Sequence, residues 1–162
     1  MATPDFVLEL RRHVGHAPLW MPGTTVVIAR PAPGCAPIDW EQPIAPEAVE
    51  ILCVRRSDNG TWTPVTGIVD PGEEPAVAAA REALEETDVR IEVRRLLSVE
   101  VVGPVTYDNG DVTTYLDVAF AAQWVSGDPT PADGENSETA FFRGDQLPPM
   151  NDRFRRAVAK AL

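Results

Sequence analysis

The sequence predicts one mixed α/β domain whose strands are largely antiparallel. Three observations predict this class. Segments rich in β-branched residues, which are typical of strands, alternate with segments in which apolar residues recur at helical spacing. No internal repeat or linker interrupts the pattern, and a length of 162 residues suits a single domain. We therefore expect one domain over residues 1–162.

The chain starts with a segment that has the pattern of a short amphipathic helix, Pro4–Val14. Phe6, Val7 and Leu10 recur at helical spacing, so we expect all three to point inward. The next segment, Thr24–Arg30, is β-branched and predicts a strand.

A proline-rich segment, Pro31–Pro46, follows this strand. Its five prolines remove backbone donors, so it predicts an irregular loop that covers the site, joins a dimer contact or simply varies in sequence. Val49–Arg56 predicts the next strand, and Ser57–Gly60 has the residues of a hairpin turn.

The second half of the chain predicts mostly strands. The predicted elements are a strand at Ile91–Val102, a turn at Tyr107–Asp111, a strand at Val112–Val125, a polar loop at Gly127–Asn136, a short strand near "TAFFR" and a closing amphipathic helix in "DRFRRAVAKAL".

Composition excludes several classes of function. The formal net charge is -11, from 25 acidic and 14 basic residues, so binding to a nucleic-acid backbone is disfavoured. Lys160 is the one lysine, which removes a Walker A loop, and the Rossmann fingerprint and the G-x-S-x-G elbow are absent. No apolar run reaches membrane-spanning length, and the first residues lack a signal-peptide pattern. We expect a cytoplasmic protein that binds neither nucleic acid nor membrane.

The segment "PAVAAAREALEET" predicts a helix that begins at Pro75, because proline suits the first turn and the alanines favour helix. Its glutamates Glu82, Glu85 and Glu86 stand at i, i+3 and i+4 and share one face. Val77, Ala80 and Leu84 fall on the opposite face, which we expect to pack against the sheet. The shared carboxylates form either a solvated acidic face or a site for a hard divalent cation such as Mg²⁺.

The stretch from Gly67 to Val89 resembles the signature of the Nudix hydrolases, G-x5-E-x7-R-E-U-x-E-E-x-G-U, where U is aliphatic. The chain matches it at every position except one aliphatic position, filled by the small Ala83, and the glycine, replaced by Asp88. "WTPVTG" and "FFRGDQLPPM" also resemble the family's flanking segments. The matching positions are Gly67, Glu73, Arg81, Glu82, Glu85, Glu86 and Val89.

This resemblance implies a Nudix fold, a mixed β-sheet sandwiched between helices, and a hydrolase that cleaves the diphosphate linkage of a nucleoside diphosphate derivative. It implies Mg²⁺, with Mn²⁺ as an alternative, held by Glu82, Glu85 and Glu86. Such ions would neutralise phosphate charge and lower the pKa of a bound water.

The resemblance also implies supporting roles around the metal ligands. Arg81 is expected to pair with a carboxylate and hold the array, and Glu73 either does likewise or completes the metal shell. Gly67 and Gly72 allow a tight loop through which backbone groups approach the metal and phosphates.

The general base is either one of the signature glutamates or an acid beyond the signature. Glu135 is the leading candidate outside the signature, followed by Glu138, and for each the alternative is a solvated loop acid. Five aromatic residues are candidates to stack on a base, although for each we favour packing in the core. They are Trp20, Trp40, Trp62, Tyr107 and Phe142.

The substrate is left open by the sequence. The short chain favours a nucleoside triphosphate, normal or damaged, cleaved to a monophosphate and pyrophosphate, over ADP-ribose or a dinucleoside polyphosphate. The alternatives in other classes are a domain that binds a nucleotide without turning it over and a non-catalytic acidic scaffold. A small-molecule substrate is the expected partner, and a homodimer is left open.

Asp88 stands just past the acidic helix, where a left-handed backbone conformation usually selects glycine. Aspartate adopts this conformation at a cost of up to about 1 kcal/mol. We therefore expect Asp88 to end the helix and to take no part in the chemistry.

Overall fold

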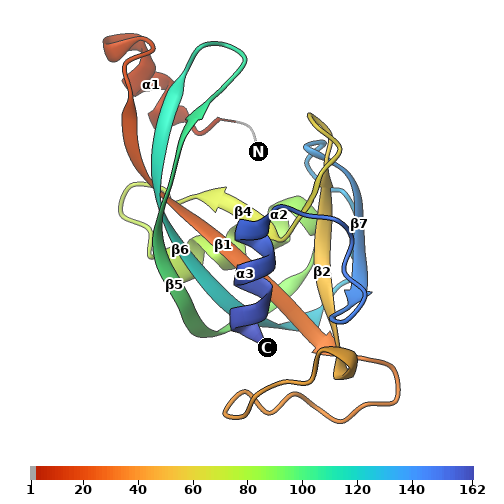
Figure 1. Cartoon of the computed structure of the whole chain (residues 1–162). Coiled ribbons are helices and arrows are strands. Elements are labelled where there is room, and N and C mark those ends of the chain that lie inside the picture. The colour runs from red at the N-terminus through yellow and green to blue at the C-terminus, as the bar shows by residue number, and fades with distance from the viewer. Residues whose placement is uncertain (1–2) are drawn as a thin grey trace.

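The computed structural model describes residues 3–162 and shows a mixed sheet of seven strands between helices (Figure 1). This confirms the predicted fold class. In chain order the elements are α1 (Asp5–Val14), β1 (Leu19–Pro31), the 3-10 helix η1 (Pro46–Ala48), β2 (Val49–Arg56), β3 (Trp62–Thr63), β4 (Val65–Ile68), α2 (Pro75–Thr87), β5 (Arg90–Thr106), β6 (Val112–Ser126), β7 (Asn136–Arg143) and α3 (Asp152–Ala161). No helix within residues 3–162 is both long enough and apolar enough to cross a membrane.

The sheet is built around β1, and its strand order is β3-β2-β1-β6-β5. β1 pairs in parallel with β6, whereas its other neighbours, β4 and β2, are antiparallel to it. β4 pairs with the middle of β1 and β2 with its end, so the two share one edge of that strand. β7 then pairs with β2. The pairing is largely antiparallel, as the sequence predicts.

Alternating side chains of β1 fill two cores on opposite faces of the sheet. Val26 and Ile28 belong to the core beneath α2, whereas Val27 and Ala29 belong to the core beneath α3. Figure 1 shows α3 on the near face of the sheet and α2 behind it. The acidic helix α2 therefore packs on the face of the sheet opposite α3.

The predicted loop of residues 31–46 lies between β1 and η1, which take its first and last residues, and it lies on the α3 side of the sheet. Its Ile38, Trp40 and Ile44 pack against the α3 core, and the Ile44 N–H donates to the Leu162 carbonyl at 2.6 Å. The loop is irregular, as predicted, and these contacts place it on the face of the sheet opposite α2.

The prediction for α1 is correct for Val7, which is buried, and wrong for Leu10, which is 42% exposed. Phe6 is partly buried beside Val7. The position four residues after Val7, on the same side of the helix, is held by Arg11. Its guanidinium donates to the Val112 carbonyl at 3.0 Å, so a polar contact replaces the apolar one at this end of α1.

The predicted bounds of α2 are confirmed, but the predicted buried face is wrong. Val77 is 57% exposed and Leu84 is 37% exposed. The side that faces the sheet instead carries three small alanines together with two of the glutamates, since alanine allows a helix to approach a sheet closely. The buried residues of α2 are Ala78, Ala79, Glu82, Ala83, Glu86 and, at its last position, Thr87.

Candidate active site

The candidate site is a cavity of about 660 Å³ beside α2. Four segments form it: the start of α1, the loop between β4 and α2, α2 itself and the loop between β6 and β7. Its volume lies in the range of small-molecule sites. The lining residues are Pro4, Asp5, Phe6, Asp70, Pro71, Arg81, Glu82, Glu85 and Asp133.

Gly67 makes room for the side chain of Glu82. A Cβ atom on residue 67 would stand 2.2 Å from the Glu82 Cγ and Cδ atoms and 2.3 Å from Oε1, so only glycine fits against this carboxylate. Gly67 lies in β4, paired with Thr24 of β1. The glycine thus allows a glutamate on the inner side of α2 to lie against the strand backbone.

Arg81 holds the carboxylates of the site together. Its guanidinium makes a two-point contact with Glu73, with Nε–Oε1 and Nη2–Oε2 distances of 2.9 Å each. Nη1 donates to Glu82 Oε1 at 2.9 Å and to Glu85 Oε2 at 3.0 Å, and Nη2 donates to the Ile68 carbonyl at 3.1 Å. One fixed fork of donors therefore joins the loop before α2 to two of its glutamates.

Glu73 also fixes the loop before α2. Its Oε2 accepts the Asp70 N–H at 3.0 Å, and the hydrogen bond from Arg81 lowers the pKa of Glu73. Gly72, in the same loop, has a φ of +82°, a conformation that glycine adopts without strain. The loop is therefore ordered by its backbone and by the Glu73–Arg81 ion pair.

Glu82 and Glu86 are buried, with 2% and 4% of their surfaces exposed, whereas the Glu85 side chain is 54% exposed at the rim. Burial raises the pKa of both inner carboxyl groups to about 7. Two neighbouring carboxylates at this depth are costly without a counter-charge. A set of oxygen donors with this shortage of positive charge fits a hard divalent cation.

The loop between β6 and β7 adds two more acidic residues. Ligand oxygens of Glu86, Asp133 and Glu135 all lie within 4.8 Å of one another. Asn136 Nδ2 donates to Glu86 Oε2 at 3.1 Å and orients this carboxylate. Glu135, the leading outside candidate for the general base, therefore lies beside Glu86, one of the signature glutamates.

Asp133 is a further acidic residue of the site, and nothing in the sequence distinguishes it from other acids of a polar loop. Backbone hydrogen bonds bring the loop to the helix: the Thr130 N–H donates to the Thr87 carbonyl at 3.0 Å and the Ala132 N–H to the Glu86 carbonyl at 3.1 Å. Glu138 lies in β7 and pairs with Arg55 at 2.6 Å. The acidic cluster does not include it.

The aromatic candidates for base stacking do not line the cavity. Trp62 and Phe142 pack edge to face with their ring centroids 5.0 Å apart in the α3 core, and Trp40 joins the same core. Packing, the favoured interpretation, is confirmed for these three. The same interpretation is wrong for Trp20, which is 60% exposed, and for Tyr107, which is 42% exposed. Tyr107 lies in the predicted hairpin turn, and its hydroxyl bonds that of Tyr115.

Known proteins resemble this chain over much of its length. A family model described as NUDIX domain matches residues 42–162. A MutT-like protein of Streptomyces ambofaciens is 45% identical over 49 residues, which are 30% of this chain and 32% of that protein. An NAD-capped RNA hydrolase NudC of Pseudomonas syringae pv. tomato is 29% identical over 115 residues, covering 70% of this chain and 38% of that protein. The chain thus spans well under half the length of these curated relatives.

Solved structures share the fold. A MutT NUDIX hydrolase from Burkholderia pseudomallei superposes with a TM-score of 0.61 at 23% identity, covering 88% of this chain and 97% of that one. A UDP-X diphosphatase superposes with a TM-score of 0.62 at 18% identity, covering 99% of this chain and 71% of that one. The family model covers more than half of the chain, including α2 and its acidic residues. The chain belongs to the Nudix family.

Proposed function

We propose that this chain, as a single domain over residues 1–162, is a hydrolase that depends on a divalent metal and cleaves the diphosphate linkage of a nucleoside diphosphate derivative. One observation carries the proposal: Glu82 and Glu86 are both buried on α2, and Glu82, which lies against Gly67 and accepts a hydrogen bond from Arg81, lines an open cavity. Buried charge of this kind is costly to the fold, which favours a functional origin over a solvated acidic face.

Glu82, Glu85 and Glu86 would hold Mg²⁺ or Mn²⁺. The three carboxylates offer only oxygen donors, which these hard ions prefer, and they lie on one side of α2. A bound ion supplies charge neutralisation at the phosphates and a water of lowered pKa.

The remaining side chains have supporting roles in this proposal. Arg81 and Glu73 fix the ligand carboxylates through their two-point contact. Glu135 lies within reach of Glu86, where a carboxylate can accept a proton from the attacking water. Glu135 is therefore the general base of this proposal.

We infer a nucleoside triphosphate as the leading substrate, cleaved to a monophosphate and pyrophosphate. ADP-ribose and dinucleoside polyphosphates are the alternatives. Proteins similar in sequence or fold include an NAD-capped RNA hydrolase, a UDP-X diphosphatase and an ADP-ribose pyrophosphatase. Each of these names refers to a compound that contains a nucleoside diphosphate. The net charge of -11 favours a small nucleotide over a long RNA.

The reaction is assigned to the cytoplasm in this proposal. Cys35 is exposed, Cys53 is buried, and both are free thiols, which fits a reducing compartment. The proposal needs no partner other than the nucleotide, and a homodimer is compatible with it.

The test is a release assay over nucleoside triphosphates, ADP-ribose, NAD and dinucleoside polyphosphates, each with Mg²⁺, with Mn²⁺ and with a chelator. We expect metal-dependent products from at least one compound, and chromatography of those products identifies the bond that breaks. Metal-dependent calorimetric binding without product over hours would favour a binding domain instead. The absence of both binding and product would reject the proposal.

A further inference from the structure

We propose that the start of α1 forms the nucleoside-binding wall of the cavity, with the ring of Phe6 as its stacking surface. This wall consists of Pro4, Asp5 and Phe6. The inference rests on the proposed function, because it assigns the part of the nucleotide that lies away from the metal ligands.

The wall and the candidate metal ligands line the same cavity. Pro4, Asp5 and Phe6 line it from α1, while Glu82 and Glu85 line it from α2. With about 660 Å³ between them, these two sides leave space for a nucleotide-sized molecule. A diphosphate held by metal ions at α2 therefore extends its nucleoside toward α1.

The distribution of charge sets this orientation. Within residues 3–162, Arg81 is the one cation that lines the cavity, and Glu73, Glu82 and Glu85 already engage it. The wall offers two apolar side chains and the carboxylate of Asp5. A phosphate would be repelled there, whereas the hydroxyl or amino groups of a nucleoside can donate to a carboxylate.

Phe6 is held in place from behind. The ring packs against the cluster of Val7, Met21 and Ile68 and is only partly buried by it. An aromatic face that is fixed on one side and borders a cavity on the other suits stacking, because every nucleobase presents a flat π surface. Preorganisation of this kind lowers the entropic cost of binding.

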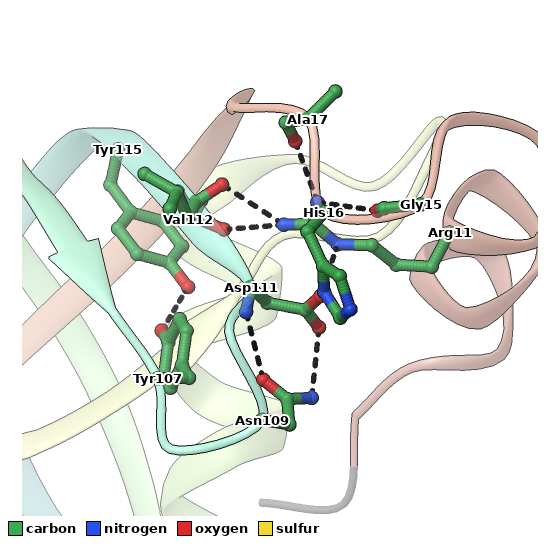
Figure 2. A network of polar contacts seen from close by, with 10 residues as sticks. Arg11, Gly15, His16, Ala17, Tyr107, Asn109, Asp111, Val112 and Tyr115 are labelled. Atoms are coloured by element: carbon green, nitrogen blue, oxygen red, sulfur yellow. Dashed lines mark hydrogen bonds and ion pairs between the residues drawn. The ribbon is translucent and has the colours of Figure 1, made fainter.

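Figure 2 shows what fixes the other end of α1 to the β5–β6 hairpin. Arg11, with a side chain 11% exposed, donates to the Val112 carbonyl at 3.0 Å and to Thr113 Oγ1 at 3.2 Å. Asp111 lies 3.5 Å from Arg11 Nε and 2.8 Å from His16 Nδ1. The helix is therefore fastened at both ends, so its first residues form a fixed wall.

The test compares matched ligands with and without a nucleoside. The probes are the α,β-methylene diphosphates of adenosine, guanosine, cytidine and uridine, and methylenediphosphonate, which presents the diphosphate alone. Calorimetry with Mg²⁺ measures their affinity for the wild-type chain and for Phe6→Leu, Phe6→Tyr and Leu8→Ala. Leucine keeps the packing of Phe6 but removes its flat face, tyrosine keeps both, and Leu8 lies on the same helix, 47% exposed and away from the cavity.

We expect Phe6→Leu to weaken binding of at least one nucleoside analogue by roughly fivefold or more and to leave methylenediphosphonate within about twofold. Phe6→Tyr and Leu8→Ala should bind as the wild type does. Equal weakening of both probe classes would show that Phe6 only supports the fold. An unchanged nucleoside affinity in Phe6→Leu, or no nucleoside preference in the wild type, would likewise overturn the proposal.

The experiment distinguishes rejection of the nucleoside-binding wall from rejection of the proposed hydrolase activity. If the wild type binds the nucleoside analogues through Phe6 but turns over no substrate, the wall is supported and the hydrolysis is rejected. If turnover is present and Phe6→Leu leaves both KM and analogue affinity unchanged, the wall is rejected and the hydrolase stands.

Discussion

Gly67 and Glu82 occupy complementary space, since a Cβ atom on residue 67 would stand 2.2 Å from the Glu82 Cγ. Glu82 is buried, with 2% of its surface exposed. The position of a candidate metal ligand on α2 therefore depends on the absence of a side chain on β4. This dependence is open to a direct test.

Gly67→Ala is expected to displace Glu82 and to raise the Mg²⁺ concentration needed for half-maximal activity by about tenfold or more. Part of the strain should also appear as a lower melting temperature. Gly23→Ala is the matched control, because Gly23 lies on the neighbouring strand and an added Cβ there meets its closest atom at 3.4 Å, an ordinary contact. An unchanged metal requirement in Gly67→Ala would show that Glu82 does not bind the metal from this position.

Glu86→Gln is expected to lower turnover and raise the stability of the metal-free protein. Mutation of a residue that hydrogen-bonds to a metal ligand typically lowers metal affinity or activity by about 10–100-fold. Loss of a ligand itself should therefore lower kcat by more than about 100-fold. The buried, raised-pKa carboxylate of Glu86 destabilises the fold at pH 8, and glutamine removes that charge while keeping its shape. Thermal melts in a chelator and steady-state kinetics measure the two effects.

The opposite pattern would remove Glu86 from the metal site. Full activity in Glu86→Gln excludes it as a ligand, and full activity in Glu85→Gln excludes Glu85 in the same way. A melting temperature that falls in metal-free Glu86→Gln would mean that the carboxylate stabilises the fold through Asn136 instead.

Metal-free stability is expected to fall as the pH rises from 5 to 8. Burial raises the folded-state pKa of Glu82 and Glu86 from 4.5 to about 7, so the folded chain binds more protons than the unfolded chain in this window. Their protonated form is fully favourable below about pH 4.5, and that contribution is lost as the pH passes through 7. The ion-paired Glu73 has a lowered pKa, so its contribution to the stability of the fold is lost only as the pH falls below the pKa of the unfolded chain. That change lies outside this window.

Scanning calorimetry at several pH values, in a chelator and with Mg²⁺, checks this dependence. Since the metal binds deprotonated carboxylates, Mg²⁺ should weaken or reverse the fall. A flat metal-free profile would contradict the prediction, as would a wild-type slope in the Glu82→Gln, Glu86→Gln double variant.

Glu135→Gln is expected to lower kcat by about 100-fold or more while leaving KM within about threefold, because a general base acts mainly in the transition state. Glu138→Gln is the control, since Glu138 pairs with Arg55 on the exposed face of β7 and such pairs contribute at most about 1 kcal/mol to stability. Equal kcat losses in both variants would show a general effect on the loop. A normal kcat in Glu135→Gln would move the base to a signature glutamate or to Asp133.

The strands and the acidic helix could be predicted from the sequence because their signals are local. The strand pattern of Val49–Arg56 predicts β2 with the bounds that the structure shows. α2 begins at Pro75, as the preference of proline for the first turn indicates. Asp88 adopts the left-handed conformation, with φ 56° and ψ 27°, that its position past the helix predicted.

The orientation of α2 could not be predicted in the same way. Spacing shows which residues share a face of the helix, but it does not show which face is buried. The larger apolar residues Val77 and Leu84 predict the wrong face as the buried one. The buried face carries alanines together with Glu82, and the fit of Glu82 against Gly67 involves a strand residue outside the helix. The position of Asp133 likewise depends on backbone hydrogen bonds between its loop and the end of α2, which no side-chain pattern records.

Asp88→Gly is expected to raise the free energy of unfolding by up to about 1 kcal/mol and to leave kcat/KM unchanged. Asp88 is the one non-glycine residue with positive φ within residues 3–162, and its N–H closes the helix by donating to the Leu84 carbonyl at 3.0 Å. Glycine relieves the steric cost of this conformation and keeps the hydrogen bond. Denaturant titration and kinetics measure the two quantities, with Asp88→Ala as the comparison that should lose stability. Because the candidate ligands all precede Asp88 on α2, a large loss of turnover in Asp88→Gly would mean that the end of the helix positions Glu86 or the loop that carries Glu135.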